Sequence, residues 1–218
     1  MIIVVDWLES RNLGDGSPSN NTKSLDYHLE LRSNSEAFFR RVIPVQLPYR
    51  WNMRRLTHGR TLEVGCGLGR NLAALSPDSV GLDHNSHSVE YCRSLGLDAR
   101  LLSDSDSAEQ TLSSSERFDT LLLAHVLEHV EREKQLPLVR RFLPFLKPGG
   151  NLLLITPQEK GYASTSSHIT WTDVARLEEL VGQLGRPATL VRSSSFPLHR
   201  SFGRFFTHNE FVVLASLE

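Results

Sequence analysis

The chain contains very little cysteine, and this scarcity excludes two kinds of site. Cys66 and Cys92 are the only cysteines among 218 residues. Two are too few for a disulfide framework, and their spacing is not that of a metal-binding cysteine motif. Two isolated thiols suit a reducing compartment. We interpret Cys66, which lies inside a glycine-rich turn, as a small residue that fills the turn and not as a catalytic thiol.

The chain also lacks a long hydrophobic run. Its apolar start, MIIVV, is too short for the core of a signal peptide or for a membrane span. We therefore expect a cytoplasmic protein without a transmembrane segment. With 39% hydrophobic residues, the 218 positions suit one compact α/β domain with a small N-terminal addition.

The most informative stretch that is present is TLEVGCGLGRNL, residues 61–72, in which three glycines alternate with other residues. A short apolar strand is predicted to turn here into a helix that begins in NLAALS. Glycine permits positive φ angles and lets a ligand lie against the main chain without meeting a Cβ atom. The free N–H groups at the start of the helix would face such a ligand. The pattern favours a cofactor-binding turn over an ordinary tight turn.

The spacing of this turn indicates which cofactor it binds. The dinucleotide fingerprint is GxGxxG, whereas this chain has GxGxG with Glu63 two places before the first glycine. An acidic residue there favours a cationic ligand over a pyrophosphate. Asp83 ends the next apolar run, SVGLD, where a parallel βαβ unit would place a carboxylate near both hydroxyls of a ribose. Glu63, the glycines and Asp83 together resemble the site of the class I S-adenosylmethionine (AdoMet)-dependent methyltransferases.

This resemblance runs from about Gly59 to the C-terminus. It implies a Rossmann-like α/β fold: a seven-stranded, mostly parallel sheet with helices on both faces and strand seven antiparallel between strands five and six. It also implies AdoMet as cofactor and S-adenosylhomocysteine as product. An acidic residue after strand three is expected near the adenine amine, and Asp104 is carried to that position, with Asp106 as the alternative. The cofactor-binding residues implied are Glu63, Gly65, Cys66, Gly67, Gly69, Asp83, His84, Asp104, Ala124 and His125.

The expected organisation is an irregular N-terminal arm over residues 1–35 and a single methyltransferase domain over 36–218. Within it, 36–57 form a helical lid, 59–157 the cofactor-binding half and 158–218 the acceptor-side half. Pro44 and Pro48 are predicted to break the lid into two short helices or a helix and a kinked turn. An ordinary amphipathic helix with solvated arginines is the alternative to a lid.

Periodicity places the remaining elements. Apolar runs predict strands near 60–64, 79–83, 99–102, 120–123 and 151–156, and two more β runs near the C-terminus. Helical stretches alternate with them, as expected for a parallel sheet with right-handed crossovers. Helices are predicted over 87–95, over 136–146 with Pro137 in the first turn, and after Thr172 as N-cap up to Gly185.

Two histidines are the candidate catalytic residues. His125 follows the strand in FDTLLLAHVLEHV, whose carboxyl end should face the methyl acceptor, and His168 lies in the loop QEKGYASTSSHITW with Tyr162 and Trp171. If the acceptor is a hydroxyl, a histidine is the natural general base. Purely structural roles are the alternative for both. Glu128 and His129 are interpreted as helix-start or packing residues, and no metal site is expected because no acidic pair with an asparagine stands at the strand ends.

Three function hypotheses stay open. The first is a methyltransferase that acts on a hydroxyl of a small molecule or glycoconjugate. The second is an RNA or protein methyltransferase, disfavoured because the chain has no appended binding domain and no NPPY-type motif. The third is a non-catalytic AdoMet-binding interaction protein. A monomer and a homodimer are both compatible with the sequence.

Acidic residues are absent from two stretches, and this absence bears on the acceptor. Residues 37–60 hold six arginines and residues 180–208 hold four, and both stretches are rich in aromatic residues. If both border the carboxyl ends of the strands, they would form a positive rim around the acceptor and favour an anionic one. In the alternative, the arginines point in different directions and cover the protein's own core.

Overall fold

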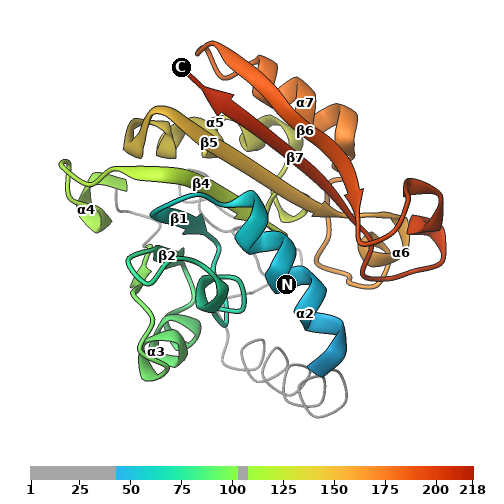
Figure 1. The fold of residues 1–218 in the computed structure, drawn as a ribbon, viewed down its shortest axis with the longest axis horizontal. Helices are drawn as coiled ribbons and strands as arrows, with labels where there is room; N and C mark the ends of the chain where they lie inside the picture. Colours follow the sequence, from blue (N-terminus) through green and yellow to red (C-terminus); the bar gives the residue numbers. More distant parts are fainter. Residues whose placement is uncertain (1–42, 103–107) are drawn as a thin grey trace, which may run out of the picture.

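The computed structural model describes residues 43–102 and 108–218, which form a central seven-stranded sheet flanked by helices (Figure 1). The strand order is β3-β2-β1-β4-β5-β7-β6. β7 pairs antiparallel with both β5 and β6, and the other neighbours pair in parallel, so the predicted fold, with strand seven antiparallel between strands five and six, is confirmed. The strands are β1 (Thr61–Val64), β2 (Val80–Asp83), β3 (Ala99–Leu101), β4 (Phe118–Ala124), β5 (Leu146–Pro157), β6 (Ala188–Phe196) and β7 (Glu210–Leu217).

Helices and short 3-10 turns connect these strands. The α-helices are α2 (Ile43–Leu56), α3 (Ser86–Ser94), α4 (Ala108–Thr111), α5 (Arg132–Phe142), α6 (Glu159–Tyr162) and α7 (Val174–Gly182). The 3-10 turns are η2 (Leu72–Ala74), η3 (Leu127–His129), η4 (Leu143–Phe145) and η5 (Arg200–Arg204). No helix in the described ranges is long and apolar enough to cross a membrane.

Four local predictions were wrong. α2 runs without a break past Pro48, whereas an interruption was expected. α5 begins at Arg132, so Pro137 lies inside the helix and not in its first turn. The N-cap of α7 is Asp173, whose side chain accepts a hydrogen bond from the N–H of Arg176, in place of the predicted Thr172. The helix expected after the glycine turn is only the three-residue η2, because Pro77 follows closely and the chain must start β2 at Val80.

The core forms on both faces of the sheet, because successive side chains of a strand point to opposite faces. In β4, Leu121 and Leu123 belong to the large cluster that packs against α5 and α7. Leu122 instead faces the other way and packs in the cluster that contains Met53 and Leu56 of α2. α2 therefore covers one face of the central strands, and α5 and α7 cover the other (Figure 1).

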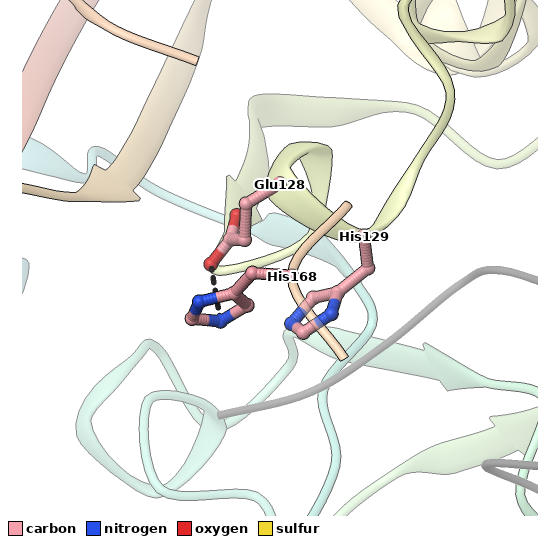
Figure 2. Close-up of side chains that lie close together, drawn as sticks. All are labelled: Glu128, His129 and His168. Carbon is pink, nitrogen blue, oxygen red and sulfur yellow. Dashed lines mark ion pairs between the residues drawn. The ribbon is translucent and has the colours of Figure 1, made fainter. Parts of the chain in front are cut away.

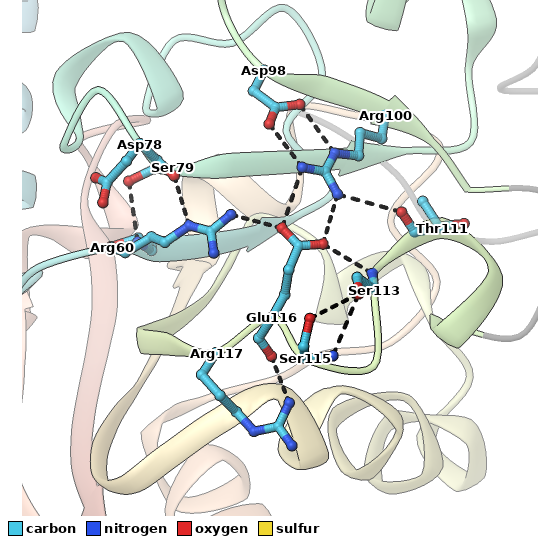
Figure 3. Close-up of polar contacts among 11 residues, drawn as sticks. Arg60, Asp78, Ser79, Asp98, Arg100, Thr111, Ser113, Ser115, Glu116 and Arg117 are labelled. Carbon is cyan, nitrogen blue, oxygen red and sulfur yellow. Dashed lines mark hydrogen bonds and ion pairs between the residues drawn. The ribbon is translucent and has the colours of Figure 1, made fainter.

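A polar network ties together the loops that precede the parallel strands (Figure 3). Glu116, just before β4, accepts hydrogen bonds from Arg60 (2.7 Å) and Arg100 (2.9 Å). Arg60 directly precedes β1 and also donates to the carbonyl of Asp78 before β2. Since the amino ends of parallel strands meet at one edge of a sheet, this network closes the edge opposite the strand carboxyl ends.

Candidate cofactor and acceptor site

The glycine turn after β1 has the backbone that only glycine adopts easily. Gly65, Gly67 and Gly69 have φ angles of 76°, 49° and 71°. The N–H groups of Gly65 and Cys66 both donate to the carbonyl of Leu82, and the N–H of Gly69 donates to that of Cys66. These donors are used inside the protein, so they do not form the nest of free N–H groups that a pyrophosphate needs.

Asp83 closes the turn from the end of β2. Its carboxylate is buried (2% exposed) and accepts hydrogen bonds from the N–H groups of Gly67 (2.8 Å) and Asn85 (2.9 Å). Burial raises the pKa of Asp83, while the nearby His84 and these two N–H groups oppose that rise. The Nδ1 atom of His84 lies 3.7 Å from Asp83 Oδ1. The predicted pair of Asp83 and His84 therefore stands beside the glycine turn, and Asp83 fixes the position of the backbone.

Glu63, in β1, is the second buried acid of this site. One of its oxygens accepts a hydrogen bond from the side chain of Asn71 (2.9 Å), while its Oε2 atom is buried without a hydrogen-bond partner among the described residues. Burial raises the pKa of Glu63 to about 8. A buried carboxyl group with an unused oxygen is suited to receive a cationic ligand.

Cys66 has the packing role that the sequence suggested. It is 2% exposed and lies next to Cys92, and a Cβ atom added at Gly81 would stand 2.7 Å from its Sγ atom. The hydrogen bond with Cys92, and then burial, raise the pKa of the Cys66 thiol well above its usual value. A thiol held protonated in this way is a poor nucleophile.

The carboxyl end of β4 carries a strained residue at the expected position. His125 follows the buried Ala124 and has a φ angle of 58°, the sole positive value for a non-glycine residue in the described ranges. Its backbone N–H donates to the carbonyl of Ile155 in β5. Such a conformation costs of order 1–3 kcal/mol and is characteristic of functional sites.

The His125 ring lies between two carboxylates. Its Nε2 atom is 2.8 Å from Glu210 Oε1 in β7, and its Nδ1 atom is 3.4 Å from Glu128 Oε1 in η3. Burial alone would lower the pKa of His125, but the hydrogen bond to Glu210 and the attraction to the carboxylates of Glu128 and Glu210 outweigh burial and raise the pKa to about 9. His125 is therefore positively charged at neutral pH, which is the protonation state of an acid or an electrostatic group and not that of a free base.

The loop after α6 brings the second predicted histidine to the same place. His168 Nδ1 lies 2.6 Å from the carbonyl oxygen of Tyr162, and its Nε2 lies 3.9 Å from Glu128 Oε1 (Figure 2). The ring stacks on Tyr162 at 5.3 Å, and Tyr162 meets Trp171 edge-on at 5.2 Å. Burial lowers the pKa of His168, so the ring is neutral at neutral pH. The loop residues that the sequence grouped thus do lie together.

Several other residues predicted for the site lie outside the described ranges or away from the site. Asp104 and Asp106, and the whole of 1–35, lie outside the described residues. Arg60 and Arg186 precede β1 and β6 and so lie at the opposite edge of the sheet, which shows that the predicted rim was wrong for these two arginines. Arg200 is held by the carboxylate of Glu159 in two hydrogen bonds (2.8 and 2.6 Å).

Sequence reasoning missed three partners in the site. Asn71 holds Glu63, Glu210 holds His125, and Glu128 stands between His125 and His168. The spacing His-Val-Leu-Glu-His, residues 125–129, was visible in the sequence and signals that the first and fourth side chains can meet across one turn. Nothing in the sequence signals Glu210, which lies 85 positions after His125.

A family model described as a methyltransferase domain matches residues 32–215. The chain belongs to this methyltransferase domain family. The predicted membership of a methyltransferase family is confirmed.

Relatives and structures agree with this assignment. The chain is 28% identical over 143 residues to a ubiquinone biosynthesis O-methyltransferase of Chelativorans sp. (strain BNC1), a match that covers 62% of this chain and 56% of that protein. It is 35% identical over 123 residues to the enzyme of the same name from Xanthomonas oryzae pv. oryzae (strain PXO99A), covering 52% and 49%. The chain thus spans about half the length of these relatives.

Two solved structures share the fold at low sequence identity. The plantazolicin methyltransferase BpumL in complex with S-adenosylhomocysteine superposes with a TM-score of 0.55 at 15% identity, covering 92% of both chains. The magnesium protoporphyrin IX methyltransferase of Synechocystis PCC 6803 with bound AdoMet gives 0.51 at 14% identity, covering 94% of this chain and 87% of the other. At these identities the likeness concerns the fold alone.

The residues of this chain fit AdoMet on their own geometry. Three glycines with positive φ keep the turn free of side chains, Asp83 is positioned at the end of β2, and Glu63 offers an unused buried oxygen toward a cation. All of them lie at the carboxyl ends of β1 and β2, next to the switch between β1 and β4 where ligands of open α/β sheets bind.

Proposed function

We propose that this protein transfers the methyl group of AdoMet to a hydroxyl group of a small molecule. The observation that carries the proposal is the glycine turn with Glu63 and Asp83 at the carboxyl ends of β1 and β2. The hydroxyl acceptor is supported by the relatives, whose names describe O-methyltransferases. Glycoconjugates remain within this class as hydroxyl-bearing acceptors, and RNA or protein acceptors are the alternative.

Bound AdoMet would supply a methyl group activated by its positively charged sulfur. The protein's own task is then to bind, align and exclude water, which can account for much of the rate. Asp83 would receive the ribose hydroxyls, and Glu63 would face the cationic methionine part. The Tyr162, His168 and Trp171 side chains would border the acceptor.

Removal of the hydroxyl proton is the step for which a histidine was predicted. The positive charge of His125, with its pKa raised to about 9, suits it to hold a negatively polarised group near the site. His168 is neutral and therefore has the protonation state that a base requires. The catalytic roles of both histidines stay predictions, which the pH dependence of single-turnover methyl transfer tests through His125→Gln and His168→Gln.

An anionic acceptor remains part of the proposal in a narrower form. Arg50, Arg54 and Arg55 on α2 carry its support, because Arg60 and Arg186 lie at the far edge of the sheet. Arg54 donates to the carbonyl of Ala74, so its guanidinium group is already oriented. Salt dependence of kcat/KM in the native enzyme and in Arg55→Gln would measure the contribution of this charge.

The test combines binding with methyl transfer. Calorimetry should detect AdoMet binding to the native protein, and Asp83→Asn, which keeps the size of the side chain, should weaken it by about tenfold, or 1.4 kcal/mol. A panel of phenols, sugars and RNA incubated with methyl-labelled AdoMet should yield label on a hydroxyl-bearing small molecule. Label on RNA or protein alone would replace the proposed acceptor, and absence of AdoMet binding would refute the proposal as a whole.

A further inference from the structure

A buried cluster next to the site contains polar atoms that the account above does not explain. Glu128 and His129 lie in η3 and are 0% exposed, and His168 reaches them from the loop after α6 with its side chain 0% exposed. Figure 2 shows the three side chains converging from these two segments. Both oxygens of Glu128, His129 Nε2 and His168 Nε2 are buried without a hydrogen-bond partner in the described part of the chain.

Unpaired buried polar atoms are costly, so this concentration in one place requires an explanation. The two imidazoles are held by their other nitrogen. His129 Nδ1 lies 2.8 Å from the carbonyl oxygen of Ser167, and His168 Nδ1 lies 2.6 Å from that of Tyr162. A carbonyl accepts only, so Nδ1 is the donor in each ring, and each Nε2 of a neutral ring carries a free lone pair.

This arrangement is the one that metal-binding histidines show. A histidine that binds a metal through one nitrogen usually donates from the other to a carbonyl or carboxylate, which fixes the ring's orientation and tautomer. Burial lowers the pKa of His129 to about 4 and also lowers that of His168. Both rings therefore stay neutral at physiological pH, as metal binding requires.

The neighbouring His125 provides a competing explanation for part of the cluster. Its Nδ1 atom lies 3.4 Å from Glu128 Oε1, and although burial opposes it, this neighbour lowers the pKa of Glu128 so that the carboxylate is ionised. An ion pair with His125 would satisfy Glu128. It leaves the inward nitrogens of His129 and His168 unexplained, because an ionised Glu128 has no proton to donate to their lone pairs.

We propose that Glu128, His129 and His168 form a binding site for one divalent transition-metal ion. Their ligand atoms all lie within 4.8 Å of one another. Ligands on a tetrahedral zinc ion with bonds of about 2.1 Å are about 3.4 Å apart, so small side-chain rotations would close the site. Two imidazoles and one carboxylate favour Zn²⁺, Fe²⁺, Co²⁺ or Mn²⁺ over Mg²⁺, which prefers oxygen ligands.

Three protein ligands leave at least one coordination position open, as in metal sites that contact a substrate. A hydroxyl or water bound at that position would lose its proton more easily. Activation of an acceptor hydroxyl by the metal rests on the proposed function, whereas the metal site itself does not. It also gives His168 a role other than that of a free base.

The test is a metal titration of the whole chelator-treated protein, followed through the visible absorption of Co²⁺. We expect saturation at one equivalent, displacement of Co²⁺ by Zn²⁺ and a rise in melting temperature with Zn²⁺. His168→Gln should weaken Co²⁺ binding by at least tenfold, by analogy with the loss of groups that merely support a metal ligand. His199→Gln, which removes an exposed histidine outside the cluster, is the matched control and should bind as the native protein does.

Folding and cofactor binding are checked separately. Circular dichroism and AdoMet calorimetry on His168→Gln show whether the variant is folded, and Glu128→Gln serves as the second variant. A native protein that binds neither Co²⁺ nor Zn²⁺ at one equivalent would overturn the proposal, as would equal Co²⁺ affinity in the native protein and in a folded His168→Gln. Either result would leave the AdoMet and methyl-transfer measurements untouched, so the two proposals fail independently.

Discussion

At the scale of single residues, Glu63 shows how burial can tune a carboxyl group for a cationic ligand. It is 1% exposed, and burial raises its pKa to about 8, from an ordinary value of 4.5. A protonated Glu63 is expected in the ligand-free protein at neutral pH, because the charged form lacks solvent. A bound cation would favour the ionised form and release the proton, so AdoMet affinity should increase with pH through the same range.

Glu63→Gln tests this through stability. A group whose pKa is raised in the folded state stabilises that state fully below the unfolded pKa, and this contribution is lost as pH rises through the folded pKa. The free energy of unfolding of the ligand-free native protein should therefore fall between about pH 5 and pH 8, and Glu63→Gln should flatten that fall. Urea unfolding at several pH values measures it, and identical slopes in the two proteins would refute the assignment.

His125 offers a second titration with the same sign. Its pKa is raised to about 9 by Glu128 and Glu210 against the effect of burial, so its stabilising contribution is complete below about pH 6.5 and disappears as pH rises through 9. Glu210→Gln should lower the His125 pKa toward its ordinary value. NMR titration of the ring protons measures this, with Glu131→Gln on the exposed surface as control. A His125 pKa that Glu210→Gln leaves unchanged would contradict the ion pair.

Residues close in sequence could be predicted, and residues joined only by folding could not. The glycine turn, Glu63 and Asp83 were found because the turn's chemistry requires glycine at fixed intervals. Glu128, His129 and His168 were not recognised as one cluster, because 39 positions separate His129 from His168 and the sequence does not show how the loop after α6 returns. No metal site was expected from the sequence, because the only pattern considered was an acidic pair with an asparagine at the strand ends.

At the scale of elements, packing decided several outcomes that local propensity did not. α2 keeps Pro48 inside the helix, although its missing N–H removes a helical hydrogen bond. Met53 and Leu56, 6% and 3% exposed, anchor the C-terminal part of this helix on the sheet. α5 likewise keeps Pro137 while Val139 and Phe142 are buried. The break in α2 was predicted from proline alone, and in α5 proline was taken to mark the first turn. In both helices, burial of the neighbouring apolar side chains outweighs the cost of an internal proline.

Two glycines provide a matched pair for testing how β2 contacts the cofactor turn. A Cβ atom at Gly81 would lie 2.7 Å from both Cys66 Sγ and Leu72 Cδ2, so Gly81→Ala should cost about 1–3 kcal/mol and weaken AdoMet binding. Gly182, at the end of α7, has open space around it, and Gly182→Ala should gain up to about 1 kcal/mol. Chemical denaturation and calorimetry measure both. Equal effects of the two substitutions would contradict this packing.

The role of α2 can be divided between its two faces. Leu56→Ala should destabilise the protein by about 2–5 kcal/mol, because it empties a packed site on the sheet. Trp51 is 58% exposed, and Trp51→Ala should change stability by less than about 0.5 kcal/mol. If α2 also serves as the predicted lid, Trp51→Ala raises KM for the acceptor at unchanged stability. An unaltered KM would leave α2 with its packing role only.

At the scale of the whole molecule, the sheet separates the proposed binding residues from the supporting polar network. The glycine turn, Asp83 and His125 stand at the carboxyl ends of the parallel strands, while the network around Glu116 closes their amino ends (Figure 3). Alternation of apolar runs with helices allowed the parallel part of the sheet to be predicted, and the resemblance to the class I methyltransferases implied the antiparallel β7. The same topology shows why Arg60 was wrongly predicted to border the acceptor. Arg60 directly precedes β1 and therefore lies at the amino edge of the sheet.

Because the two edges of the sheet are separate, the stability lost in Glu116→Gln and the stability gained from AdoMet binding should be additive. Although burial opposes it, hydrogen bonds from Arg100, Ser113 and Arg60 lower the pKa of Glu116 to about 2, so its stabilising contribution is present above about pH 4.5 and is lost as pH falls through 2. Glu116→Gln should therefore cost about 2 kcal/mol at neutral pH. AdoMet at a hundred times its Kd should add about 2.7 kcal/mol to the stability of both the native protein and Glu116→Gln.

Asp83→Asn, in contrast to Glu116→Gln, should gain less stability than the native protein from the same AdoMet concentration. With affinity reduced tenfold, the added stability falls to about 1.4 kcal/mol, since the ligand then stands at only ten times the new Kd. Thermal and urea unfolding of the three proteins with and without AdoMet provide the comparison. A Glu116→Gln protein that loses much of the AdoMet increment would show that the two edges of the sheet are coupled, because distant and independent sites contribute additively.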